Sequence, residues 1–137
     1  MEPTQPTPHP RTFGKAERLC RQLLIDRLFA GGSKSLVSFP LRLVYLPVEE
    51  ADVRVPVSIL VSVPKKRFRR AVKRNRVKRQ VREAYRLNKH ILLDTVTRRQ
   101  LHLVMGFIWL GNELCSTQEV ERRVVNLLQR LSERLDA

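Results

Sequence analysis

The chain has 137 residues, with 27 Lys or Arg against 13 Asp or Glu, and a formal net charge of +14 at pH 7. This length allows one domain with a single modest core. No apolar run approaches the ~18 residues of a membrane span and no signal-like leader begins the chain, so we expect a cytoplasmic protein with no membrane anchor. The charge excess favours a polyanionic partner.

The N-terminal part combines a polar leader with a predicted helix. Residues 1–10 hold four prolines and almost no apolar side chains, which predicts a disordered leader before a single domain at 11–137. An apolar helical stripe then begins around Lys15 and ends at Gly31-Gly32. Its last turn carries Ile25 and Phe29. From the residues alone, the interpretation of Phe29 as a core aromatic side chain stays open.

Three stretches show the alternation of β-strands. The first runs from Leu36 to Leu46 and places Phe39, Leu41, Leu43 and Tyr45 on one face. The second runs from Val53 to Val63. Its Pro56 indicates either that this strand lies at a sheet edge or that the proline lies in the start region of the strand. A short acidic connection between the two predicts an antiparallel hairpin. The third strand is expected from Leu101 to Leu110.

A strongly basic segment runs from Lys65 to Lys89. It contains thirteen Lys or Arg residues and one acidic residue, Glu83, so it carries +12 of the chain's net charge of +14. A surface that only kept the protein soluble would mix its signs. The segment therefore favours binding to a polyanion over the plainer interpretation as a solvated face.

Helical periodicity gives this basic segment an anchor. Val77, Val81, Ala84 and Tyr85 recur on one helical face and predict a stripe that packs on a core. At ~100° per residue, polar side chains project from the opposite side. These are Asn75, Lys78, Arg79, Arg82 and Arg86, with Arg76 on the flank. We therefore expect a rigid cationic ridge.

The final helix opens with Ser116-Thr117-Gln118-Glu119, which has the spacing of a capping box. Its apolar positions repeat every three or four residues, so one face should pack on the sheet. The predicted order is α-β-β-α-β-α. This order indicates an α+β two-layer sandwich with helices packed on a small sheet.

The basic helix resembles the signature helix of the bacterial ribonuclease P protein component. The resemblance rests on the run AVKRNRVKR at 71–79, continued by Arg82-Glu83. It extends to FGKAERL at 13–19, to Leu28-Phe29 before Gly31-Gly32, and to a strand ending in Val44-Tyr45. The resemblance covers residues 11–135. The resemblance also implies a left-handed crossover around the basic helix, which sequence patterns do not reveal.

What the resemblance implies is a protein subunit of an RNA-based endoribonuclease. In that family the RNA subunit hydrolyses a phosphodiester bond to remove the 5′ leader of precursor tRNA, and it holds most of the Mg²⁺. The partners expected here are ribonuclease P RNA and precursor tRNA, with no obligate protein partner. Residues expected at the RNA subunit are Lys65, Lys66, Arg70, Arg74, Asn75, Arg76, Lys78, Arg79, Arg82 and Arg86. Those expected at the leader are Ile25, Phe29 and Tyr45, although Tyr45 also fits a core tyrosine.

Candidate catalytic groups are sparse in the chain. The acidic residues fall in turns and on helix surfaces, and the three histidines, His9, His90 and His102, lie far apart in the sequence. No metal-ligand spacing or acid/base pair stands out, so we expect neither catalytic nor metal-binding residues in this chain. The alternative function is a ribosomal or ribosome-assembly protein that uses the same basic helix. A major-groove DNA reader is disfavoured because a strand, not a helix-turn-helix pair, precedes the basic helix.

Overall fold

The computed structural model describes residues 13–14, 17–18, 22–49 and 55–137. In these ranges the element order is α1 (Gln22–Leu28), β1 (Lys34–Ser38), β2 (Leu41–Pro47), β3 (Val57–Ser62), α2 (Ala71–Asn88), α3 (His90–Arg98), β4 (Leu103–Trp109) and α4 (Thr117–Asp136). The predicted leader at 1–10 and the predicted helical residues 15–16 and 19–21 lie outside the described residues. At Arg18 the predicted helix is wrong, since this residue forms a β-bridge and α1 begins only at Gln22. The α+β class is confirmed, since the described residues form a four-stranded sheet with four helices.

The strand order is β1-β2-β4-β3. Strand β4 pairs antiparallel with β2 and parallel with β3, so the predicted hairpin between the second and third strand regions is wrong. The apolar side chains of β4 are buried on both of its faces, including Val104, Met105 and Phe107. Such a strand belongs in the middle of a sheet, and β4 therefore separates β2 from β3.

The predicted strand from Leu36 to Leu46 is in fact two strands. Residues Phe39-Pro40, joined by a cis peptide bond, form a turn between β1 and β2. The Pro40 carbonyl accepts a hydrogen bond from the Leu110 amide at 2.7 Å, and the Phe39 side chain is 64% exposed. The alternation of apolar residues continues through the turn, and for this reason it concealed the break.

Strand β3 agrees with its sequence pattern. Val57, Ile59 and Val61 are buried in the core. Pro56 directly precedes β3, and β3 lies at one edge of the sheet. Because proline has no amide hydrogen to donate to a ladder, this position confirms the edge assignment.

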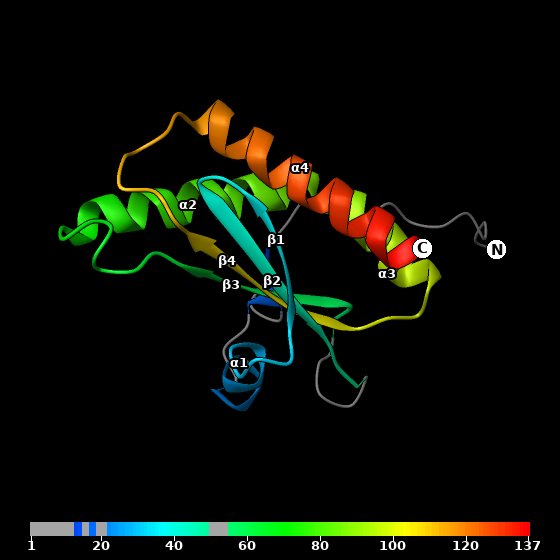
Figure 1. Ribbon diagram of the computed structural model, residues 1–137. Coiled ribbons are helices and arrows are strands. Elements are labelled where there is room, and N and C mark those ends of the chain that lie inside the picture. Colours follow the sequence, from blue (N-terminus) through cyan, green and yellow to red (C-terminus); the bar gives the residue numbers. More distant parts are fainter. Residues whose placement is uncertain (1–12, 15–16, 19–21, 50–54) are drawn as a thin grey trace.

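Helices α2, α3 and α4 cover one face of the sheet, and α1 lies on the other (Figure 1). The main core includes the buried side chains of α2 and α4, whereas α1 contributes Leu24 and Leu28 to a smaller cluster with Val44 and Val104. The serine half of the predicted capping box of α4 is confirmed, since the Ser116 hydroxyl accepts a hydrogen bond from the Glu119 amide at 3.1 Å. The Glu119 carboxylate accepts hydrogen bonds from Arg122 and Arg123. In this part of the chain no helix combines the length and apolarity of a membrane span.

Helix α3 was not predicted, because no Gly or Pro marks the end of α2. Lys89 caps the C-terminus of α2 and the N-terminus of α3 with helical dihedral angles, φ −62° and ψ −22°. Leu92, Leu93 and Val96 of α3 are buried. The order of elements is therefore α-β-β-β-α-α-β-α.

Arginine residues lie at both edges of the sheet, through their side chains at β1 and through the main chain at β3. At the β1 edge, Arg130 Nη1 donates to the Val37 carbonyl at 2.7 Å and Arg134 Nη1 donates to the Ser35 carbonyl at 3.5 Å. At the β3 edge, Arg18 forms a parallel β-bridge with Ile59. Residues 17–18 thus lie beside the outermost strand of the sheet.

Candidate nucleic-acid interface

Helix α2 packs one side on the core and displays its cations on the other. Val77, Val81, Ala84 and Tyr85 are buried, as predicted, and Gln80 joins them. We call the opposite side the basic face of α2. It comprises the exposed Asn75, Arg76 and Arg79 and the half-buried Lys78, Arg82 and Arg86. Because the buried stripe holds the helix on the core, the spacing of these side chains is set before any ligand binds.

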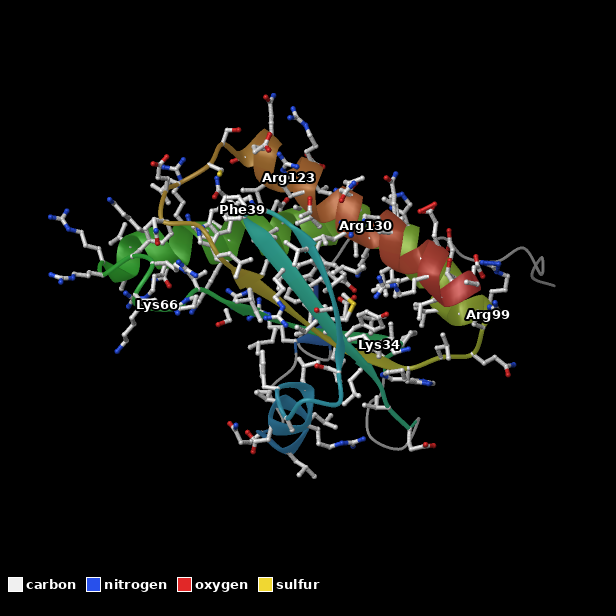
Figure 2. All side chains as sticks on the ribbon, in the orientation of Figure 1. Lys34, Phe39, Lys66, Arg99, Arg123 and Arg130 are labelled. Carbon is white, nitrogen blue, oxygen red and sulfur yellow. The ribbon has the colours of Figure 1, made fainter. Side chains whose placement is uncertain are left out.

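The basic face continues into the turn that precedes α2. Lys65 and Lys66 are exposed in this turn, and Arg70 is the exposed N-cap residue. Figure 2 shows Lys66 at the end of the molecule where α2 begins, far from Arg99 at the opposite end of the helical layer. The predicted RNA-binding cations therefore extend from this tip along α2.

Arg74, one of the predicted RNA-binding residues, also makes hydrogen bonds within the protein. Its Nη1 donates to the carbonyls of Phe68 and Arg69, both at 2.8 Å. Phe68 is buried in the core. Arg74 thus braces the turn that carries the other cations, and its guanidinium is partly occupied by the protein itself.

Lys89 differs from the other cations of the basic segment. Its side chain is 4% exposed, and its Nζ lies 2.5 Å from Oε1 of Glu17. This ion pair ties the N-terminal segment to the end of α2. The sequence count of +12 therefore overstates by one the charge that the segment displays, since Lys89 is buried and paired with Glu17. Arg86 pairs with Glu83, whose negative charge that count already includes. Hydrogen bonding from Arg86 lowers the pKa of the Glu83 carboxyl.

A groove lies between α2 and the N-terminal segment. The Phe13 ring meets Tyr85 edge-on at 6.0 Å, and the Arg18 guanidinium lies over the Phe13 ring at 5.4 Å. The groove is lined by Phe13, Arg18, Asn75, Arg79, Arg82, Glu83 and Arg86. Burial, followed by repulsion from Arg18, lowers the pKa of Arg82. Sequence reasoning assigned neither Phe13 nor Arg18 to a site, although both lie in the FGKAERL stretch that carried the family resemblance.

The predicted leader-binding residues divide between the two faces of the sheet. Ile25 and Phe29 lie on the α1 side, where Ile25 is half-buried and Phe29 is 48% exposed. Gly106 of β4 permits the close approach of the end of α1, because a Cβ atom there would lie only 3.3 Å from the Leu28 side chain. The exposed part of the Phe29 ring is available to a ligand.

Tyr45 is on the opposite face, and its assignment to the leader site is wrong. Its side chain is 2% exposed and lies in the main core with Leu41 and Leu43. The hydroxyl accepts a hydrogen bond from Nη1 of Arg134 at 3.3 Å. Neighbouring residues of a strand point to opposite faces, so Val44, and not Tyr45, faces α1. Tyr45 is a core tyrosine.

No three His, Cys, Asp or Glu side chains of the described ranges gather as a potential metal site. Of the histidines, His90 is exposed and His102 half-buried, and His9 lies outside the described residues. The basic face of α2 and the groove beside it display mainly cation, amide and aromatic groups. These groups bind phosphates, base edges and base faces.

Comparison with known proteins identifies the family. A family model described as Ribonuclease P matches residues 13–132. The ribonuclease P protein component of Porphyromonas gingivalis is 50% identical over 125 residues, which cover 90% of each chain. The RNase P protein structure from Staphylococcus aureus has a TM-score of 0.67 at 19% identity and covers 85% of this chain and 96% of that one. The structure from Thermotoga maritima has a TM-score of 0.65 at 22% identity, with 83% and 96% covered, so both share the fold. The chain belongs to the family of ribonuclease P protein components.

Proposed function

We propose that this chain is the protein subunit of ribonuclease P and supports the endonucleolytic 5′ maturation of tRNA. Family membership favours this function over the ribosomal alternative that the sequence left open. The observation that supports this mode of action is the basic face of α2. The buried stripe of the helix anchors this face on the core, and its cations continue to Lys65 and Lys66. In this proposal the basic face docks on the RNA subunit, and the surface around Ile25 and Phe29 holds the leader of precursor tRNA.

The protein contributes binding, and the RNA subunit contributes the chemistry. Arg and Lys side chains neutralise phosphates and release counterions. Arg adds planar, fork-shaped donors that match phosphate oxygens, and the Asn75 amide suits a ribose or a base edge. The Mg²⁺ that activates water is assigned to the RNA subunit, as the family resemblance implies. Beside the leader, Phe29 offers an aromatic face on which any base can stack.

The first prediction concerns the division of labour. With a ribonuclease P RNA, the full chain should lower the Mg²⁺ concentration needed to cleave precursor tRNA, because its cations replace diffuse counterions at the interface. The chain without RNA should leave the precursor intact. The assay follows release of the 5′ leader across a magnesium titration. Cleavage by nuclease-treated, RNA-free protein would contradict the proposal, and copurification with ribosomal subunits at moderate salt would favour the alternative.

The second prediction tests the leader surface. Phe29→Leu keeps an apolar side chain but removes the aromatic face, so it should weaken precursor binding to the holoenzyme by about 1–3 kcal/mol for one stacked base. Mature tRNA, which has no leader, should bind as before. Competition binding of the two tRNAs to the holoenzyme measures the ratio of precursor to mature tRNA affinity.

The matched control for Phe29 is Tyr45→Phe. This change removes the hydroxyl that accepts the Arg134 hydrogen bond while the buried ring stays in place. The ratio of precursor to mature tRNA affinity should therefore equal that of the wild type. A wild-type ratio in Phe29→Leu as well would show that the leader does not stack on this surface.

A further inference from the structure

We propose that the groove between α2 and the N-terminal segment binds one unpaired nucleotide of an RNA, with its base stacked on the Arg18 guanidinium. This inference rests on the proposed function, because it names what one part of the RNA interface recognises. It adds a subsite built by Phe13 and Arg18, which lie outside the basic segment.

The stacking surface is already assembled in the protein. Tyr85 is buried in the core and meets the Phe13 ring edge-on at 6.0 Å. The Arg18 guanidinium lies over that ring at 5.4 Å, and Arg18 is an exposed residue that lines the groove. The guanidinium is thus held beside an aromatic ring, and because Arg18 is exposed its plane can meet a base. RNA-binding proteins stack unpaired bases on Arg planes as well as on aromatic rings.

The backbone holds Arg18 in this position. Its main chain forms a β-bridge with Ile59 of β3. The preceding residue, Glu17, pairs with the buried Lys89 at 2.5 Å and accepts a hydrogen bond from the Gly14 amide at 2.8 Å. A base stacked on Arg18 therefore meets a surface that is fixed at three points, and ordering it costs little additional conformational entropy.

The other groups of the groove favour a nucleotide over a bare phosphate. Arg79 and Arg82 are placed to hold the phosphate. Asn75 supplies both a donor and an acceptor, and the Glu83 carboxylate, whose oxygens already accept from Arg86, keeps lone pairs that suit the amino group of a base. The groove has a volume of about 510 Å³, within the range of about 300–1,000 Å³ usual for small-ligand sites. A single nucleotide fits such a space, whereas a base in a continuous duplex cannot turn its edge into it.

The test separates stacking from charge. Arg18→Lys keeps the positive charge and loses the plane, whereas Arg18→Ala loses both. With ribonuclease P RNA, we expect Arg18→Lys to lose roughly 10-fold in affinity, the order of one stacked base, with an unchanged salt slope. Chemical probing of the RNA should show one unpaired nucleotide that the wild type protects and Arg18→Lys does not. The matched control, Arg122→Lys, changes an exposed arginine of α4 paired with Glu119 and should keep both the affinity and the footprint.

A second arm does not depend on ribonuclease P RNA. The full chain, labelled with ¹⁵N, is titrated with a five-nucleotide single-stranded RNA and with a duplex of the same length. The signals of Arg18 Nε and the Asn75 side-chain amide should shift with the single strand and stay in place with the duplex. Should Arg18→Lys prove unstable by circular dichroism, Asn75→Ala, exposed on a stable helix, replaces it in the first arm, where we expect a loss of affinity and of the same protected nucleotide.

The outcomes distinguish the two proposals. Wild-type affinity and footprint for Arg18→Lys, or equal shifts with single strand and duplex, would overturn the nucleotide site while leaving the proposed function in place. If ribonuclease P RNA is neither bound nor assisted but the single strand still shifts both signals, the nucleotide site stands and the proposed function fails.

Discussion

Removing two charges from the basic face of α2 should weaken RNA binding far more than removing two from α4. In Arg76→Gln/Arg79→Gln, each lost phosphate contact lowers the slope of log K against log salt by about one unit. Two contacts correspond to roughly 30-fold in affinity at physiological salt on the same counterion-release argument. Both residues are exposed, with Arg79 opposite the buried stripe and Arg76 on its flank, so the fold should be retained.

The matched control is Arg122→Gln/Arg123→Gln. It also removes two arginine charges from one helix, but these side chains pair with Glu119 on α4, away from the basic face. Binding of ribonuclease P RNA is measured at four or more salt concentrations for both double variants. An equal loss of slope in the two would mean that total charge, and not the basic face, determines binding.

The ion pair between Glu17 and Lys89 should dominate the stability of the N-terminal segment. Lys89→Met leaves the Glu17 carboxylate without this partner in a place where its side chain is 15% exposed. Breaking one partner of a buried pair typically costs about 3–5 kcal/mol. We expect a loss of this order in the free energy of unfolding, measured by urea denaturation followed by circular dichroism.

The double variant Lys89→Met/Glu17→Gln identifies the cause. Once neither side chain is charged, the penalty for an uncompensated charge disappears, so most of the lost stability should return. If instead the double variant loses the sum of the two single losses, the ion pair makes no net contribution and packing of the lysine stem explains the effect.

The elements that were predicted best from the sequence are those whose residue pattern allows a single interpretation. In α2 a single apolar stripe runs against a continuous run of cations, and in α4 the Ser116 cap stands directly before a regular stripe. Local rules suffice there, because each residue's environment is determined by residues three or four positions away. The basic face of α2 could therefore be derived without any knowledge of the sheet.

Tyr45 shows where such reasoning fails. Strand β2 is apolar on both faces, with Leu43 and Tyr45 on one and Val44 on the other. Alternation indicates that Tyr45 and Val44 point in opposite directions, but it cannot tell which face α4 will cover. That choice depends on strand pairing between distant parts of the chain. The same limit explains the mistaken hairpin, since β4 enters between β2 and β3 from about forty residues later in the sequence.

The groove was missed for a related reason. Phe13 and Arg18 precede α2 by more than fifty residues, and each has an ordinary local pattern. Their role follows from the β-bridge to Ile59 and the ion pair to Lys89. Neither contact leaves a periodic trace in the sequence. The family resemblance had included these residues, but it did not say which of them share a surface.

The arginines at the sheet edges bear on how the protein behaves when concentrated. Unpaired carbonyls on an edge strand can recruit a strand from another molecule and start aggregation. At β1 the outward carbonyls of Ser35 and Val37 already accept hydrogen bonds from Arg134 and Arg130, and at β3 the Arg18 segment occupies part of the edge. A strand from a second copy would have to displace these groups and approach their charges. The exposed Val37 and Phe39 side chains are thereby kept from becoming a site of intermolecular sheet growth.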